Sequence, residues 1–371
     1  MTQGKLRWGI LSTAQIARKN WKAIRNSGNS TVVAVASRDM AKCQRFIESC
    51  QCEAPMESVP QSFGSYQELL ASPNVDAVYI PLPTGLRKEW VIRAAQSGKH
   101  VVCEKPCAVG LNDLKEMVDA CKANGVQFMD GVMFMHSRRL DKIREVLDQK
   151  EDIGQIKRIA TSFSFRADDN FYLENIRANS LLEPHGCLGD LGWYCIRFAL
   201  WVMNEELPHR VVGRILSSSQ GDQNSLHVPT EFSGELYFSN GVSSGFYCSF
   251  LVHDDQSATI NGTAGYLHLA DFVVPFFGNE VSFRIDRSAL NVVGCDFYME
   301  ARRPEIFVNE YSSSHATAQE TNLFRNFVDQ VRSGNLNAQW PEIALNTQKI
   351  MQACYESAVS GGVPVHLSSG I

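Results

Sequence analysis

Long runs of one kind of residue are missing from this chain of 371 residues. No stretch approaches the roughly 18 uninterrupted apolar residues that a membrane-spanning helix requires, so no membrane partner is expected. No run of like charges occurs, and the formal net charge is −5, which argues against a nucleic-acid-binding surface. With 44% hydrophobic and 20% charged residues, the composition is that of a globular protein rather than a disordered or fibrous one.

Several motifs are also missing. No hydrolase elbow is expected, because the Gly-x-Ser-x-Gly match at Gly241–Gly245 lies within a predicted strand rather than at a strand-to-helix turn. The histidines do not have the spacing of metal ligands, so no metal is predicted. Its eleven cysteines include no Cys-x-x-Cys pair, and the first residues lack the apolar run of a signal peptide. We therefore expect reduced thiols in a cytoplasmic protein.

The length corresponds to two domains rather than one. Residues 1–128 alternate short β-branched runs with helical patterns, from a strand at Leu6–Leu11 to one at Gln127–Asp130. Continuous apolar strands that alternate with helices are typical of a parallel sheet covered on both faces. The sequence therefore predicts an α/β, doubly wound first domain.

Residues 129–371 have a different pattern. Between Arg210 and Ile285 strands follow one another with only turn residues between them, and helices are expected near Arg139–Gln149, Leu188–Met203, Gln319–Ser333 and Pro341–Ser360. The segment between Asp168 and Asn179 is interpreted as a polar loop. Strands without intervening helices are antiparallel, so this domain is predicted to be α+β with a large, mostly antiparallel sheet.

The junction of the first strand and first helix is where a dinucleotide-binding unit needs small residues, because the backbone turns sharply toward a pyrophosphate. The expected Gly-x-Gly-x-x-Gly/Ala register contains Ser12, Ala14 and Ala17, so two glycines are replaced. Serine and alanine are the smallest residues with a β-carbon, and the Ser12 hydroxyl can itself donate a hydrogen bond to a phosphate. The alternative is a tight turn followed by a helix cap.

The end of the second strand bears on the choice of nucleotide. An acidic residue there binds the ribose 2′-hydroxyl of NAD, whereas a cation suits the 2′-phosphate of NADP. This chain has Ser37 and Arg38, with Asp39 one step later, which favours NADP while leaving NAD possible. The alternative is that Arg38 is a solvated surface arginine.

Two further segments contain groups suited to proton chemistry. Lys105, in Glu104-Lys105-Pro106, follows a predicted buried strand at the sheet edge where ligands of open α/β sheets bind, and partial burial would lower the pKa of its ammonium. Asp190 and Tyr194 are four residues apart and share one face of a helix. Lys105 as a surface partner of Glu104, and Asp190 and Tyr194 as a cap and a core residue, remain the alternatives.

These residues belong to an ordered set that resembles the Gfo/Idh/MocA oxidoreductases, within the branch that contains dihydrodiol and D-xylose dehydrogenases. The matching segments span nearly the whole chain: Pro81-Leu-Pro-Thr84, Ala94-Ala95, Gly98-Lys-His-Val101, Glu104-Lys-Pro106, Met129-Asp-Gly131, Gly189-Asp-Leu-Gly-Trp-Tyr-Cys195, Gly262-Thr-Ala-Gly265 and the closing helix.

The resemblance implies a Rossmann domain followed by an α+β domain whose open sheet often mediates dimers, so a homodimer or higher homo-oligomer is expected. It implies Lys105 and Tyr194 as the catalytic pair, supported by Asp190. The cofactor would be bound by Ser12, Thr13, Ala14, Gln15, Ile16, Ser37, Arg38, Pro81, Leu82, Pro83, Thr84, Glu104 and Lys105. Candidate substrate contacts are Phe165, Asp169, Arg177 and Trp193.

The resulting hypothesis is an NADP-dependent oxidoreductase that transfers a hydride between nicotinamide and a CH–OH/C=O group of a sugar or cyclic trans-diol. Two alternatives remain: a dinucleotide-binding regulatory protein without turnover, and an enzyme that keeps its nucleotide bound between two substrates. Arg87 departs from the histidine that relatives often carry shortly after the Pro-Thr segment, and Met135 and Arg138 depart from the frequent Arg and Pro further on, so the substrate stays open.

Overall fold

The computed structural model describes residues 4–219 and 226–367, without the side chains of Asp169, Leu173 and Glu174. It divides the chain into two compact units. The first comprises residues 1–136, 181–183 and 311–348, and the second comprises 137–180, 184–310 and 349–371. No helix among the described residues is long and apolar enough to cross a bilayer.

The first unit is built on a six-stranded sheet in the order β3-β2-β1-β4-β5-β6. All neighbouring strands in it are parallel, and this order is that of the dinucleotide-binding doubly wound fold. Its strands are β1 (Leu6–Leu11), β2 (Ser30–Ala36), β3 (Gln61–Phe63), β4 (Ala77–Ile80), β5 (His100–Cys103) and β6 (Phe128–Asp130). The predicted parallel sheet is confirmed.

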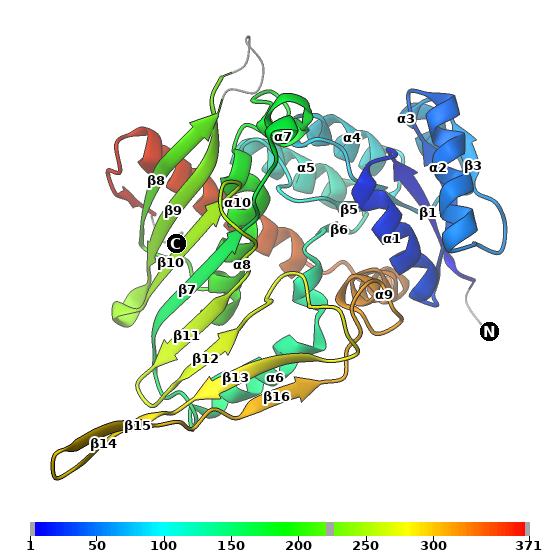
Figure 1. Ribbon diagram of the computed structural model, residues 1–371. Helices are drawn as coiled ribbons and strands as arrows, with labels where there is room; N and C mark the ends of the chain where they lie inside the picture. Colours follow the sequence, from blue (N-terminus) through cyan, green and yellow to red (C-terminus); the bar gives the residue numbers. More distant parts are fainter. Residues whose placement is uncertain (1–3, 220–225, 368–371) are drawn as a thin grey trace. The chain divides into compact units, whose positions relative to one another are not determined.

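The helices of the first unit connect these strands or cover the sheet (Figure 1). They are α1 (Gln15–Asn26), α2 (Met40–Glu53), α3 (Tyr66–Ala71), α4 (Thr84–Gln96), α5 (Leu111–Ala123), the short 3₁₀ helix η1 (Met133–His136) and, from the other end of the chain, α9 (Gln319–Arg332). Helix α10 (Gln339–Val359) is divided between the two units at residue 348.

Helix α9 lies beside α1 and completes the core of the first unit, although its sequence position placed it in the predicted second domain, residues 129–371. The Phe324 and Phe327 rings lie 5.2 and 5.3 Å from the ring of Trp8 on β1. Each buried aromatic ring contributes about 2–3 kcal/mol through removal of apolar surface from water. The apolar stripe of α9 predicts a buried face but does not indicate which sheet it covers.

The second unit is built on a nine-stranded sheet in the order β16-β13-β12-β11-β7-β10-β9-β8-β17. Neighbouring strands are antiparallel except β7 and β10, which are parallel, so the predicted mostly antiparallel sheet is confirmed. The strands are β7 (Ile156–Ser164), β8 (Arg210–Ser219), β9 (Val228–Tyr237), β10 (Ser243–Ser249), β11 (Ala258–Gly262), β12 (Tyr266–Leu269), β13 (Val281–Asp286), β16 (Glu305–Val308) and β17 (Val365–His366).

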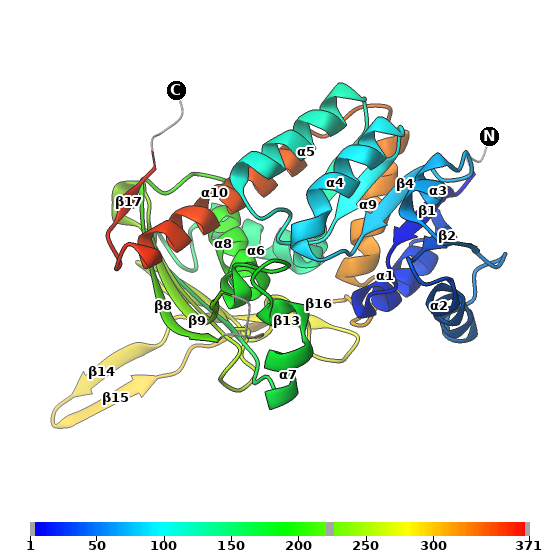
Figure 2. The same cartoon turned by 90° about the horizontal axis from the view of Figure 1, so that it is seen from above.

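One face of this sheet is apolar and buried, and the other is polar and open. Residues alternate along each strand, so Phe232 and Leu236 of β9 are buried while Ser233 and Glu235 are only half-buried. The helices of this unit are α6 (Arg138–Gln149), α7 (Asp169–Glu174), α8 (Trp193–Val202) and the short turns η2 (Ile176–Ala178), η3 (Leu188–Gly192) and η4 (Ser239–Gly241). A separate two-stranded hairpin, β14 (Ala289–Val293) and β15 (Asp296–Glu300), extends past the end of the sheet (Figure 2).

Candidate active site

The turn between β1 and α1 has the sharp geometry expected of a phosphate-binding turn, although it lacks the usual glycines. Ser12 has a φ of 134°, a region that residues with a β-carbon rarely adopt. Its amide donates to the carbonyl of Ala36 over 3.0 Å, and its hydroxyl accepts from the amide of Ala14 over 3.1 Å. These bonds hold serine in a backbone conformation that glycine reaches at no steric cost.

The first turn of α1 presents amide groups that no side chain caps. Ala14 occupies the N-cap position and supplies no side-chain acceptor, and Gln15 and Ile16 are exposed. Thr13 is half-buried next to them. Uncapped amides at the positive end of a helix dipole are suited to bind a phosphate, so the chemistry of this turn fits a dinucleotide.

The three residues at the end of β2 differ in exposure and in their hydrogen bonds. Ser37 is buried and its hydroxyl accepts from the amide of Asp39 over 3.3 Å, while Arg38 is exposed. The Asp39 carboxylate accepts from the amide of Lys42 over 3.0 Å and thereby caps α2. The acid in this segment thus has a structural partner, and Arg38 is the side chain turned to solvent.

The loop after β4, Pro81-Leu82-Pro83-Thr84, is fixed by a segment that is distant in sequence. Glu183 accepts from both the amide and the hydroxyl of Thr84, over 2.9 and 2.6 Å. The amide of Gly85 donates to the carbonyl of Leu182 over 3.0 Å. A β-carbon at Gly85 would lie 2.4 Å from the carbonyl oxygen of Leu181, so only glycine allows this close approach. No motif in the local sequence marks Glu183.

Arg87, on the first turns of α4, ties this loop to the segment that carries Lys105. It is 5% exposed, and its Nε donates to the carbonyl of Leu82 over 2.7 Å. Its Nη1 donates to the hydroxyl of Thr84 over 3.0 Å and to the carbonyl of Pro106. Arg87, which stands where relatives often carry a histidine, is therefore buried and connects the two loops.

Lys105 follows β5 and is half-buried. The carboxylate of the preceding residue, Glu104, is held by a buried chain of hydrogen bonds. Asn20 of α1 donates to the hydroxyl of Tyr79 over 2.6 Å, and that hydroxyl donates to Glu104 over 2.5 Å. The other Glu104 oxygen accepts from the amide of Lys105 over 3.3 Å. Glu104 is thus engaged by the Tyr79 hydroxyl and by main chain, and burial, with the nearby Glu104 charge, raises the pKa of Tyr79.

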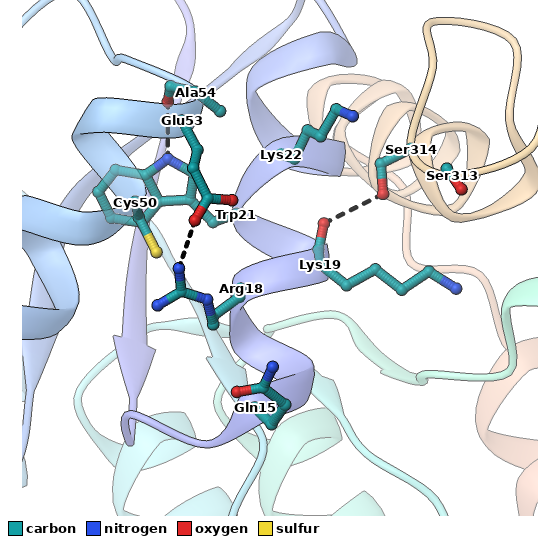
Figure 3. Close-up of a pocket in the computed structure, with 10 residues that line it drawn as sticks. All are labelled: Gln15, Arg18, Lys19, Trp21, Lys22, Cys50, Glu53, Ala54, Ser313 and Ser314. Carbon is teal, nitrogen blue, oxygen red and sulfur yellow. Dashed lines mark hydrogen bonds and ion pairs between the residues drawn. The ribbon is translucent and has the colours of Figure 1, made fainter.

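A hollow of about 330 Å³ lies beside α1, between α2 and the loop at Ser313 and Ser314 (Figure 3). Arg18 there pairs with Glu53 over 2.6 Å, and the carbonyl of Lys19 accepts from the Ser314 hydroxyl over 3.1 Å. The hollow includes Gln15 but neither Arg38 nor Lys105. Its contacts anchor α1 to α2 and to the loop at Ser313 and Ser314.

The remaining catalytic candidates, Asp190 and Tyr194, belong to the second unit. Asp190 lies in η3, a π-helical turn that runs directly into α8, which contains Tyr194. The prediction of a single α-helix over both residues is therefore wrong. The Oδ2 atom of Asp190 is 2.7 Å from Nε of Arg177. Tyr194 is 8% exposed and packs edge-on against Phe163, with ring centroids 5.6 Å apart. π-helical turns occur frequently at functional sites.

The predicted substrate residues have different surroundings. Arg177 is 42% exposed, on the short turn η2. Phe165 is half-buried and packs against Phe250 and Phe171. Trp193 is fully buried beside Arg197, which leaves it no surface for a substrate. The side chain of Asp169 lies outside the described residues, and its segment begins the short helix α7 rather than the polar loop that was expected.

Comparison with known proteins adds independent findings. Residues 6–132 match the family model described as an oxidoreductase family with an NAD-binding Rossmann fold, and residues 140–268 match the GFO/IDH/MocA C-terminal domain. A trans-1,2-dihydrobenzene-1,2-diol dehydrogenase of Mus musculus is 31% identical over 73% of this chain and 76% of its own length. An NADP(+)-dependent D-xylose 1-dehydrogenase of Haloferax volcanii is 26% identical over 95% of this chain and 98% of its own.

Solved structures have the same fold. A 3-ketoreductase from Actinomadura kijaniata, in complex with NADP and TDP-benzene, has a TM-score of 0.78 at 23% identity, over 96% of this chain and 98% of its own. An aldose-aldose oxidoreductase from Caulobacter crescentus has a TM-score of 0.79 at 21% identity, over 98% of this chain and 100% of its own.

Proposed function

The chain belongs to the Gfo/Idh/MocA oxidoreductase family, and from that premise we propose that it is an NADP-dependent dehydrogenase or reductase. It transfers a hydride between nicotinamide and a CH–OH/C=O group of a sugar or cyclic trans-diol. The observation that carries this proposal is the half-buried Lys105 at the carboxyl end of β5. It lies between a carboxylate anchored by Tyr79 and a proline carbonyl anchored by Arg87.

The described residues fit the cofactor in three places. The uncapped first turn of α1 and the Ser12 hydroxyl would bind the pyrophosphate, Ser37 and the exposed Arg38 the 2′-phosphate, and Pro81–Thr84 with Glu104 the nicotinamide side. When bound, the nicotinamide ring supplies or accepts the hydride. NAD is the alternative cofactor, and the Haloferax relative, which carries NADP(+) in its name, supports the phosphorylated form.

The protein's own residues would handle the proton. We propose that the Tyr194 hydroxyl gives a proton to, or takes one from, the substrate oxygen, and that the Lys105 ammonium polarises that oxygen or stabilises the phenolate of Tyr194. Asp190, which forms an ion pair with Arg177, orients the Lys105 and Tyr194 side chains. Phe165 and Arg177 are the proposed substrate contacts, and the substrate class follows the sugar and diol substrates in the names of the relatives.

Two further expectations complete the proposal. The eleven cysteines are free thiols, which supports a reducing compartment such as the cytoplasm. The polar, open face of the nine-stranded sheet supports self-association into a homodimer or higher homo-oligomer.

The test is a screen of pentoses, hexoses and cyclic trans-diols for the absorbance of the reduced nucleotide, with NADP and NAD in parallel. With an accepted substrate, Lys105→Met and Tyr194→Phe should each lower kcat by about 100-fold or more, while the dissociation constant of NADP changes little. Lys115→Met, on α5, is the matched control for charge removal.

Full activity in both variants would refute the catalytic assignment. Tight NADP binding without turnover of any substrate would instead favour a regulatory dinucleotide-binding protein. A nucleotide absorbance that stays with the purified protein would indicate an enzyme that keeps its cofactor between two substrates.

A further inference from the structure

The hairpin formed by β14 and β15, residues 289–300 and here called the arm, exposes apolar side chains that a folded chain normally covers. Leu290, Val292, Phe297 and Met299 are 62, 54, 70 and 62% exposed. An isolated two-stranded hairpin is marginally stable in water, because it has no third strand or helix on which to bury its apolar face. The arm thus has the composition of a packed element without a covering layer.

The register of the arm places these side chains on a single face. Leu290 lies opposite Met299, and Val292 lies opposite Phe297. Residues directly opposite each other in an antiparallel pair point to the same side, and alternate pairs share a side. The four side chains therefore form one apolar face.

The intervening pairs form the second face of the arm, which is more polar. Asn291 lies opposite Tyr298, Ala289 opposite Glu300, and the exposed Val293 opposite Asp296. The Asn291 side-chain amide donates to the Glu300 carboxylate over 3.1 Å. The arm is thus amphipathic, with one side suited to water and one side suited to a partner.

The arm is a direct extension of the edge of the large sheet. Val281 of β13 pairs with Val308 of β16, and Ala289 pairs with Glu300 in the same register. Between them the amides of Ile285 and Arg287 donate to the carbonyls of Pro304 and Arg302, each over 2.9 Å. The two strands therefore continue without a bulge from the sheet into the arm.

Alternation along this continuous ladder shows which face the apolar side chains extend. In β13, Phe283 and Ile285 are buried on the covered face, whereas Ser282 and Arg284 are half-buried on the open face. Even-numbered positions continue to Leu290 and Val292. In β16, Phe307 lies opposite Ser282 and is 58% exposed. The apolar face of the arm thus lies on the open side of the sheet.

From this geometry we propose that the arm is a clasp for a second copy of this chain, which covers the apolar face of the arm and the open face of the sheet together. Stable interfaces bury roughly 800 Å² on each partner, more than two short strands supply, so the arm needs the continuous sheet face beside it. The inference rests on the proposed self-association and adds the element that carries it.

The charges on the open face favour a copy of the same chain over a partner of one sign. Arg158 of β7 pairs with Glu235 of β9 across the intervening strand β10, and Arg284 lies opposite Glu305. A face that presents both signs side by side is suited to meet itself across a two-fold axis, where each acidic position finds a basic one.

The test is the oligomeric state of the full chain, measured by light scattering and sedimentation over a range of concentrations. The double variant Leu290→Ser/Phe297→Ser should raise the dissociation constant of the dimer by about 100-fold or more, because buried aromatic and aliphatic anchors carry most of the binding energy of an interface. The matched control, Asn291→Ser/Tyr298→Ser, changes the pair on the polar face and should raise it less than about 5-fold.

A second variant covers the case in which the serine substitutions unfold the arm. Residues 289–300 are replaced by Asn-Gly, a turn that joins opposite residues of a hairpin, and Ser288 and Ala301 are opposite in this ladder. This variant should keep the circular dichroism of the parent and become monomeric.

Each outcome either supports or overturns the proposal. A monomeric parent chain at all concentrations overturns both the clasp and the proposed self-association. A dimer that survives both arm variants overturns the clasp alone. Sedimentation of the parent with vesicles of equal parts phosphatidylcholine and phosphatidylserine, lost in the arm variants, would identify a lipid surface as the occupant and overturn the second copy. Dehydrogenase activity is assayed separately and bears only on the proposed function.

Discussion

At the scale of single residues, serine and arginine replace the groups that usually mark a dinucleotide site. Ser12 adopts a φ of 134° in the phosphate turn, where glycine is the usual residue. Arg38 is exposed at the end of β2, and Asp39 is used to cap α2. We therefore expect the choice between NADP and NAD to depend on Arg38.

Arg38→Ala tests that dependence. We expect the ratio of kcat/KM for NADP to that for NAD to fall by about 10-fold or more, because a charge-assisted contact with the 2′-phosphate contributes about 1.5–3 kcal/mol. Steady-state kinetics with both nucleotides provides the measurement. Arg45→Ala, which removes another exposed arginine on α2, is the control and should leave the ratio unchanged. A preserved preference for NADP in Arg38→Ala would contradict the role given to Arg38.

At the scale of elements, the loops after β4 and β5 are held together by a buried side chain. Arg87 donates to carbonyls on both loops, and Thr84 is held by Glu183. The planar guanidinium donates in several fixed directions at once, which the ammonium of lysine does not reproduce. The position of Lys105 thus depends on a residue that need not touch the substrate.

Arg87→Lys should lower the free energy of unfolding by about 1–3 kcal/mol, because buried carbonyls lose their donors. It should also lower kcat more than it raises KM, since the displaced group is Lys105. Urea unfolding and steady-state kinetics measure the two effects. Arg93→Lys, on the same helix but in an exposed ion pair with Glu89, should change both by little. An unchanged kcat in a destabilised Arg87→Lys would leave Arg87 with a purely structural role.

Most elements could be predicted from the sequence because their apolar residues follow a period or form a short run. The bounds of β1 and β5 match the expected strands, which contain the apolar runs Trp8–Leu11 and Val101–Cys103. The short strand β3 and the helices α3 and α7 were not predicted, because three to six residues carry too little periodicity. The arm was missed for another reason: its apolar alternation lies on an exposed element.

The sequence indicates candidate site residues only where a motif surrounds them. Lys105 and Tyr194 lie in recognisable segments, and their convergence stays a prediction. Glu183 and Arg87 act through contacts with main chain that is distant in sequence or on another loop, and no local pattern marks such contacts. Trp193 lies within the motif, yet it is fully buried. Proximity in the sequence to a catalytic candidate thus did not indicate exposure to substrate.

At the scale of the whole molecule, stability should depend on pH through a buried histidine. Burial lowers the pKa of His185 from 6.5 to about 4, and its ring packs edge-on against Tyr355 with centroids 5.1 Å apart. Below pH 6.5 the unfolded chain binds a proton that the folded chain excludes, so stability is full above that pH and falls as the pH drops toward 4. The burial of His100 and His268 lowers their pKa in the same direction.

We expect His185 to account for a loss of about 2 kcal/mol between pH 7 and pH 5. Urea unfolding at the two values measures the loss, and His185→Phe should reduce it by about that amount. His253→Gln, at an exposed position, is the control and should show the parent's dependence. Equal acid sensitivity in His185→Phe and the parent would show that other groups control it.

The distribution of exposed and buried thiols allows site-specific chemical labelling. Of the eleven cysteines only Cys52 and Cys295 are exposed. Burial raises the pKa of Cys50 to about 11 and that of Cys121 to about 12, which suppresses the reactive thiolate. Cys295 occupies the bend between β14 and β15. Once Cys52 is changed to serine, a maleimide dye would therefore attach at the tip of the arm, and energy transfer from there would follow association directly.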